Sequence, residues 1–258
     1  MQRFLIYCHV FLLAFVWLHI SPAFADAKAT AIVKAAIDYW RDENSCSVSK
    51  MTIHRPDWER AMTMRVWTMG MKNSLVRVIK PKKDKDNANL ITNDKMWAYS
   101  PKISRIIKIP SSMMSQSWMG SDFSNNDVAK ADSLLENYTH TLNGTESHWG
   151  RTVYVIEAVP FEDAPVVWGK EVVKIRDDYL LLEHAFYDQD NVLVKKMETK
   201  EIRLMGDKLI VTKQRMEKVD VPDEWTEIVV QEARFKINVP SNTFTQSNLR
   251  NPRSRRCQ

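Results

Sequence analysis

Side chains that can act as nucleophiles, bases or metal ligands are scattered along this chain and form no recognised catalytic motif. The sequence contains no G-x-S-x-G, no phosphate-binding G-x-x-x-x-G-K and no zinc-binding H-E-x-x-H. No two histidines beyond the first 25 residues have metal-ligand spacing; these are His54, His140, His148 and His184. The carboxylate pairs Asp177-Asp178 and Asp188/Asp190 fall where turns are predicted, so we expect them to be solvated. The sequence predicts no catalytic residue, metal site or cofactor, and a hydrolase is the least favoured function.

A cluster of soft apolar side chains is the clearest indication of binding chemistry. Residues 107–123 read IKIPSSMMSQSWMGSDF, and five large apolar residues stand among the serines: Met113, Met114, Trp118, Met119 and Phe123. Methionine is unbranched and polarizable, so a methionine-rich surface adapts to varied apolar partners. In a helix, Met114 and Trp118 would share one face. The segment therefore either fills a β core or forms an adaptable lid over a lipid-binding cavity.

Two polar sites are interpreted as structural. His140, in the string YTHTL, is expected to be a hydrogen-bonded residue of the fold and not a catalytic base. The string HRPDW at residues 54–58 predicts a hairpin turn supported by Trp58. In that turn Arg55 has two candidate partners, Asp57 or a lipid head group.

The first 25 residues have the layout of a secretory signal peptide. Arg3 is followed by an apolar run and then by Ala23-Phe24-Ala25, so cleavage is expected after Ala25. The alternative, a retained membrane anchor, is less favoured because the run is short for a spanning helix. We therefore expect a protein exported to the periplasm.

Charge and cysteine content narrow the range of partners. The net charge of +5 falls to +4 when Arg3 is removed, and both signs are spread along the chain. Nucleic-acid binding is not expected, because only residues 80–85 and 250–256 concentrate basic side chains. Cys46 and Cys257 remain after cleavage, and an exported protein can join them. Because Cys257 lies in a polar basic tail that we expect to be loose, the pairing stays open.

Periodicity places one helix before a long run of strands. Apolar spacing predicts an amphipathic helix over residues 28–42 and a shorter helix over residues 127–136. Alternation and turn residues predict strands, which are 62–66, 75–79, 96–99, 105–109, 149–159, 166–175, 179–187, 192–205, 208–219 and 225–237. No βαβ alternation occurs, so a parallel nucleotide-binding sheet is excluded. The pattern favours one curved antiparallel sheet or an open barrel.

Three strings carry a family resemblance: MTIHRPDW at 51–58, MWAYSPKISRIIKIPSSMMSQSWMGSDFSNND at 96–127, and DSLLENYTHTL at 132–142. They resemble the LolA-like outer-membrane lipoprotein-sorting family, and within it the branch found beside RND-type (MMPL-like) exporters. The resemblance implies a mainly β fold, a curved half-open antiparallel barrel with a helical lid over an apolar cavity for acyl chains. It also implies no catalysis. The family's carrier holds its lid closed with an arginine, for which no residue of this sequence is matched.

The expected organisation is a signal peptide (1–25), one lipid-binding domain (26–245) and a basic C-terminal tail (246–258). The cavity wall is assigned to Met62, Met64 and Trp97, and the lid to Met113, Met114, Trp118, Met119 and Phe123. The first hypothesis is a periplasmic carrier that moves lipoprotein acyl chains or another lipid toward an outer-membrane acceptor, with transient membrane contact. The second is a lipid sensor or an accessory subunit of an RND-type transporter.

Overall fold

The structure is a computed structural model that describes residues 26–41, 44–130, 132–252 and 257. The predicted signal peptide and residues 253–256 and 258 of the predicted tail lie outside this part of the chain. Within the described ranges no helix is both long and apolar enough to cross a bilayer.

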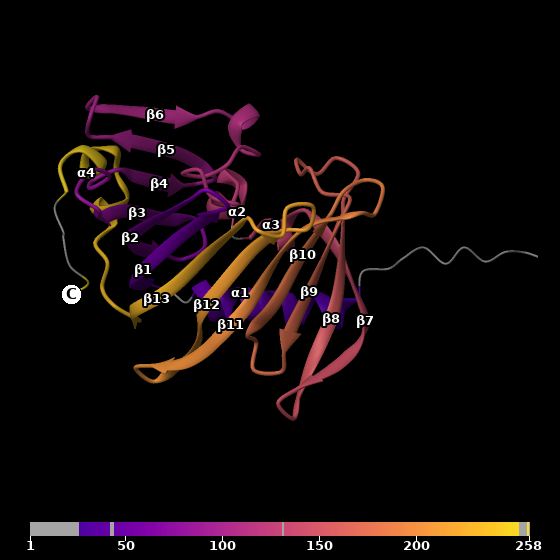
Figure 1. The fold of residues 1–258 in the computed structure, drawn as a ribbon. Helices are drawn as coiled ribbons and strands as arrows, with labels where there is room; N and C mark the ends of the chain where they lie inside the picture. The colour runs from indigo at the N-terminus through magenta and orange to yellow at the C-terminus, as the bar shows by residue number, and fades with distance from the viewer. Residues whose placement is uncertain (1–25, 42–43, 131, 253–256, 258) are drawn as a thin grey trace, which may run out of the picture.

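Helices are few and strands are many (Figure 1). The helical elements are α1 Ala27–Arg41, η1 Ser111–Met113, α2 Asn125–Ala129, α3 Ser133–Glu136, η2 Ser241–Phe244 and α4 Gln246–Arg250. The first six strands are β1 Asn44–Arg55, β2 Trp58–Met69, β3 Asn73–Lys80, β4 Ala88–Thr92, β5 Lys95–Ser100 and β6 Arg105–Ile109. The remaining strands are β7 Tyr138–His148, β8 Arg151–Pro160, β9 Lys170–Arg176, β10 Leu181–Tyr187, β11 Leu193–Met205, β12 Lys208–Lys218 and β13 Trp225–Phe235.

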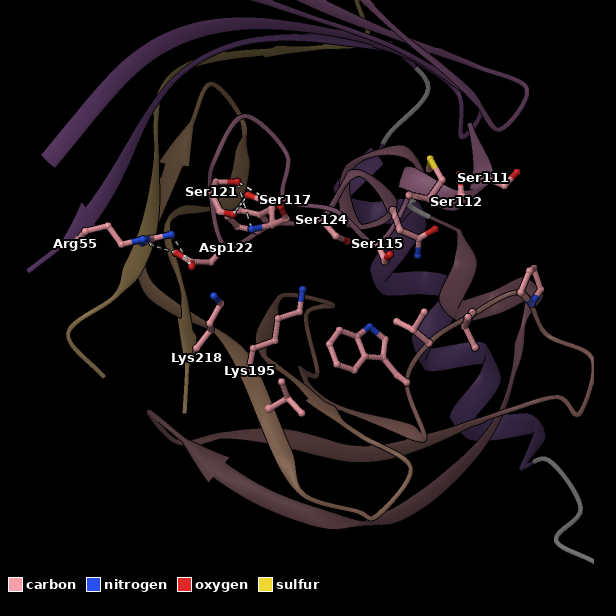
Figure 2. A pocket seen from close by; sticks show the side chains of 18 residues that line it. Arg55, Ser111, Ser112, Ser115, Ser117, Ser121, Asp122, Ser124, Lys195 and Lys218 are labelled. Carbon is pink, nitrogen blue, oxygen red and sulfur yellow. Dashed lines mark hydrogen bonds and ion pairs between the residues drawn. The ribbon is translucent and has the colours of Figure 1, made fainter. Parts of the chain in front are cut away.

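All the strands belong to one 13-stranded antiparallel sheet in the order β6-β5-β4-β3-β2-β1-β13-β12-β11-β10-β9-β8-β7. Its first and last strands, β6 and β7, do not pair with each other within the described residues, so the sheet stays open. It curves around α1 and the segment that follows β6 (Figures 1 and 2). The predicted curved, half-open barrel with a few helices is confirmed.

Turn chemistry sets the strand register. Two-residue hairpin loops need left-handed backbone, which Asn and Gly adopt at low cost. Asn93 (φ 48°) and Asp94 (φ 61°) turn β4 into β5, and Gly206 (φ 66°) begins the turn between β11 and β12. The turn between the strands predicted over residues 192–205 and 208–219 is therefore confirmed.

Several local expectations differ from the structure. The helix predicted over residues 127–136 is two short helices, α2 and α3, and α2 begins at a capping box formed by Ser124 and Asp127. The expected helix around Met114 is only the single turn η1, because Pro110 and the serines favour turns over a continuous helix. Strands β1, β4 and β7 were not predicted, and the strand predicted over residues 166–175 begins only at Lys170. The sequence of β7, YTHTLNGTESH, is polar, because an edge strand has few apolar neighbours.

The predicted helix over residues 28–42 is confirmed as α1 and covers one end of the sheet. Its buried side chains pack against β8 and β9, and the contacting residues are Ala29, Ile32, Val33, Ala36, Ile156, Val173 and Ile175. His140 lies beneath it at 1% exposure, with Nε2 2.8 Å from the Leu134 carbonyl oxygen and Nδ1 3.2 Å from the Thr30 hydroxyl. His140 is thus the structural residue that was expected.

Stability should depend on the protonation of His140. Burial lowers its pKa below the ordinary 6.5, although the hydrogen bond to Leu134 acts in the opposite direction. The unfolded chain therefore binds a proton first as the pH falls, and stability that is full above about pH 6.5 is lost as the pH falls toward the folded-state pKa. Denaturant unfolding of wild type and His140→Gln between pH 7 and pH 5 should give a smaller loss in the variant. Equal losses would contradict this origin.

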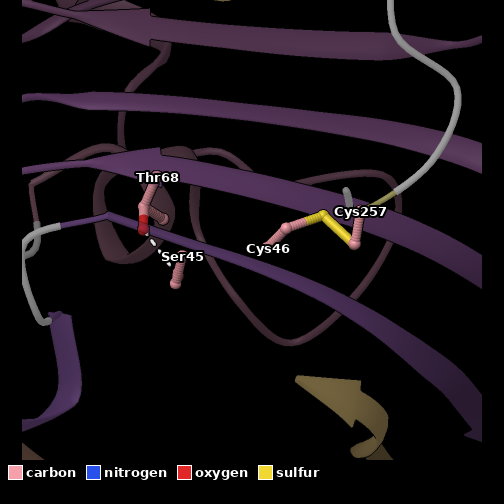
Figure 3. The surroundings of a disulfide bond; sticks show 4 residues. All are labelled: Ser45, Cys46, Thr68 and Cys257. Atoms are coloured by element: carbon pink, nitrogen blue, oxygen red, sulfur yellow. Dashed lines mark hydrogen bonds between the residues drawn. A yellow bond between two sulfur atoms is a disulfide. The ribbon is translucent and has the colours of Figure 1, made fainter. Parts of the chain in front are cut away.

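The outer face of the sheet carries a second core closed by the C-terminal segment. Side chains of residues 239–249 pack on β2–β5; they include Val239 before η2, Phe244 of η2 and the fully buried Leu249 of α4. Cys257 forms a disulfide with Cys46 of β1 (Figure 3). The question left open by the sequence is settled in favour of pairing. Residues 246–250 of the predicted basic tail form the helix α4, in which Leu249 supplies an apolar anchor within a polar stretch.

Candidate functional site: a plug loop and an amphipathic cleft

Residues 110–124, named the plug loop here, enter the hollow of the curved sheet. The loop folds back on itself: the Trp118 amide donates to the Phe123 carbonyl (2.7 Å), and the Asn125 amide donates to the Gln116 carbonyl (2.9 Å). Left-handed backbone at Met119 (φ 53°) and Gly120 (φ 79°) makes the tip. Short polar side chains satisfy the backbone of this buried turn, so it needs no regular secondary structure.

The plug loop supplies two buried aromatic side chains to the inner core. Trp118 (4% exposed) and Phe123 are buried among side chains of the sheet, which are Met51, Ile53, Met62, Met64, Val76, Val78, Ile91, Met96, Phe186 and Met216. The Trp118 indole donates to the Asn89 amide oxygen at 3.0 Å, so its polar atom is satisfied in this buried place. Met114 and Met119 pack at the margin. The apolar interior is therefore closed by a loop and is not empty.

A buried ion pair fixes the tip of the plug loop to the end of β1. The Arg55 guanidinium donates twice to the Asp122 carboxylate, at 2.9 and 3.2 Å, and the Asp122 side chain has 0% exposure. The Thr226 hydroxyl of β13 donates a hydrogen bond to the Asp122 carboxylate at 2.6 Å. The same hydroxyl accepts a hydrogen bond from the Asp122 backbone amide at 3.0 Å. Glu224 also pairs with Arg55, at 3.3 Å. We call Arg55, Asp122 and Thr226 the latch.

Beside the latch lies a cleft of about 470 Å³ (Figure 2). One wall is apolar and consists of Pro165, Val166, Val167, Trp168 and Val194. The opposite wall is the plug loop, which contributes Met114, Phe123 and the serines 111, 112, 115, 117, 121 and 124. Three cations also line the cleft: Arg55, Lys195 and Lys218. Its volume is within the range of small-molecule sites, and its mixed walls suit an amphiphile.

One of these cations is held by both a charge and aromatic rings. Lys195 of β11 lies 2.6 Å from the Asp127 carboxylate, and both side chains are largely buried. Its ammonium is also 5.2 Å from the ring centre of Trp168 and 4.7 Å from that of Phe186. These contacts join β11 to the end of the plug loop, because Asp127 also caps α2.

The predicted binding residues do not all lie together. Met62, Met64, Trp118 and Phe123 share the inner core, with Met114 and Met119 at its margin. Met113 is 38% exposed and does not line the cleft. Trp97 is misplaced in the prediction: it packs in the outer core, while its neighbour Met96 faces inward, because successive strand residues point to opposite faces.

Sequence reasoning missed the latch and the cleft cations. The sequence singled out Arg55 with Asp57 or a lipid head group as its partner. In the structure Arg55 pairs with Asp122, so the pairing with Asp57 is wrong. The two residues are 67 positions apart, and no local spacing rule connects them. The expected HRPDW turn itself is confirmed between β1 and β2. Lys195 and Lys218 carried no signal, because isolated strand lysines are usually solvated.

Comparison with known proteins places the chain in a family. A family model described as "Uncharacterized protein" matches residues 70–251, which is more than half of the chain. The chain belongs to this family. No curated protein matches the sequence.

Comparison with solved structures shows which fold this chain has. A DUF1329 family protein from Desulfovibrio piger is 24% identical with a TM-score of 0.77, over 86% of this chain and 98% of that one. A domain described as an outer membrane lipoprotein-sorting protein, from Vibrio parahaemolyticus, is 23% identical with a TM-score of 0.75, over the same shares. A LolA superfamily protein from Nitrosomonas europaea is 21% identical with a TM-score of 0.70, over 85% and 98%. At these identities the likeness establishes the fold, so the LolA-like fold expected from the sequence is confirmed. The association with RND-type exporters stays a prediction.

Proposed function

We propose that this protein is a periplasmic carrier that shields the acyl chains of a lipoprotein or another lipid under the plug loop and delivers them toward the outer membrane. The observation that supports this most is the origin of the inner core: a loop with a single 3₁₀ turn supplies Trp118 and Phe123, two of the three buried aromatic side chains of that core. A loop can leave while the hydrogen-bonded sheet stays intact. Its departure would uncover the methionines 51, 62, 64, 96 and 216, which can repack around a ligand.

The energies involved make such an exchange reversible. A buried aromatic covers about 150–250 Å², which at about 25 cal/mol per Å² gives roughly 4–6 kcal/mol each for Trp118 and Phe123. An acyl chain of about 16 carbons contributes on the order of 10 kcal/mol at about 0.8 kcal/mol per CH₂. The two amounts are similar, so the loop and a chain can compete for one space. The latch would set the balance and would serve as the lid-closing arginine contact.

Native mass spectrometry of protein purified from the periplasm tests this function. We expect a fraction of the molecules to carry lipid, and we expect that lipid to pass to acceptor vesicles in a second step. Protein that never carries lipid, and that also fails to bind a fluorescent fatty-acid probe, would refute the carrier role. Lipid that is bound but never released would instead favour the sensor or transporter subunit, whose partners remain predictions.

A further inference from the structure

Two lysines face each other across neighbouring strands at the cleft. Lys195 of β11 and Lys218 of β12 are direct partners in the antiparallel register. Both line the cleft, and Figure 2 shows their ammonium groups directed into the same space below the plug loop. Like charges placed directly opposite each other in a sheet are destabilising. An anion bound between the two lysines in the cleft would reduce the repulsion between them.

The neighbouring carboxylates do not provide that anion to both lysines. Asp127 pairs with Lys195 at 2.6 Å. Asp122, the carboxylate that lines the cleft, accepts both hydrogen bonds of the Arg55 fork, and Glu224 pairs with the same arginine. Within the part of the chain that the structure describes, Lys218 makes no ion pair with any carboxylate, so its charge is available to a ligand.

We propose that Lys195 and Lys218 bind the oxyanionic head group of the carried amphiphile. This inference rests on the proposed function and specifies its substrate class, a lipid with a phosphate or carboxylate near the end of its acyl chain. The lysines hold the anion. Ser117 and Ser121 already donate their hydroxyl hydrogens to carbonyls of the plug loop, so Ser115 and Ser124 are the cleft serines that offer further hydrogen bonds. A lysine ammonium binds phosphate well as a compact point charge.

The layout of the cleft gives the ligand a direction. The apolar wall 165–168 lies opposite the serines, and Met114 and Phe123 line the cleft while also contacting the inner core. An acyl chain that starts from the lysines therefore meets an apolar surface that is continuous with the core beneath the plug loop. Head group and chain occupy adjoining regions of one site.

Calorimetric binding of two probes with the same chain tests the inference. The probes are myristoyl lysophosphatidylglycerol, which is anionic, and monomyristoylglycerol, which is neutral. We expect Lys218→Gln to lower the affinity ratio of the anionic to the neutral probe about tenfold, because a hydrogen bond to a charged group is worth about one such factor. Lys213→Gln, on the same strand but outside the cleft, should leave the ratio unchanged. Added salt should weaken the anionic probe alone.

Other outcomes separate the two proposals. If both probes bind and Lys218→Gln leaves their ratio unchanged, the head-group site is wrong and the carrier function stands. If neither probe binds, the carrier function fails. Glycerol phosphate, which lacks a chain, should bind far more weakly than the lysolipid. If it binds equally well, the lysines take a free anion and the assignment to a lipid is overturned.

Discussion

Asp122→Asn is expected to make the protein less stable and at the same time bind acyl chains more tightly. The variant loses the carboxylate charge that pairs with Arg55, and the Asp122 side chain is fully buried. This loss should lower the free energy of unfolding by about 2–3 kcal/mol. The same loss destabilises the closed plug loop. Apparent affinity rises with the population of the binding-competent state, so a fluorescent fatty-acid probe should bind about tenfold more tightly. Chemical denaturation and probe titration measure the two effects separately.

The control for this variant is a second bidentate pair, in which the arginine is buried and the aspartate side chain is 20% exposed. The Arg176 guanidinium donates two hydrogen bonds of 2.8 Å to the Asp178 carboxylate at the turn after β9, away from the plug loop. Asp178→Asn should lower stability and leave probe affinity at the wild-type value. If Asp122→Asn leaves the affinity unchanged, or if both variants raise it equally, the latch does not control access.

Trp118→Ala should produce the largest loss of stability and a protein that the ligand rescues. Removing this indole from the inner core costs about 3–5 kcal/mol, part of it for the cavity left behind. A fatty acid that enters the vacated space restores apolar contacts and binds only the folded protein. The increase in melting temperature on adding saturating myristate should therefore be larger in the variant than in wild type.

Trp67 offers a matched comparison because it is also 4% exposed, but in the outer core. Trp67→Ala should lose a similar amount of stability without gaining an enhanced response to myristate. If Trp118→Ala does not fold, Trp118→Phe provides a smaller cavity with the same expected sign. A myristate response in Trp118→Ala no greater than in wild type would show that no acyl chain enters beneath the plug loop.

The sequence predicts the local parts of this fold well. Regular apolar spacing locates α1 to within one residue at each end, because one face of that helix must cover the sheet. Residues that adopt left-handed backbone at low cost, such as Gly206, mark the hairpin turns in the sequence, because these turns require that backbone conformation. The polar edge strand β7 escapes prediction, because a strand with little burial leaves little pattern.

The candidate site is less predictable for two reasons. Its contacts join residues that are far apart in the sequence, and the face on which a strand residue lies depends on a register that one residue can shift. Met96 and Trp97 are both large and apolar, so composition alone does not tell which one faces inward; a shift by one residue reverses the face. The pairs Arg55–Asp122 and Lys195–Asp127 bring together residues more than 60 positions apart. Such contacts follow from the whole sheet topology and not from any motif.

The pairing of β1 with β13 has a consequence for how the protein is made. These strands lie at the centre of the sheet, yet they come from opposite ends of the described chain. During synthesis, β1 can form ladders with β2 early, while its other edge stays unpaired until more than 170 further residues have emerged. An unpaired central strand invites association with other chains. The unpaired edge of β1 is therefore the place where we expect an incomplete chain to associate with other chains, and truncation before β13 removes the strand that completes the sheet.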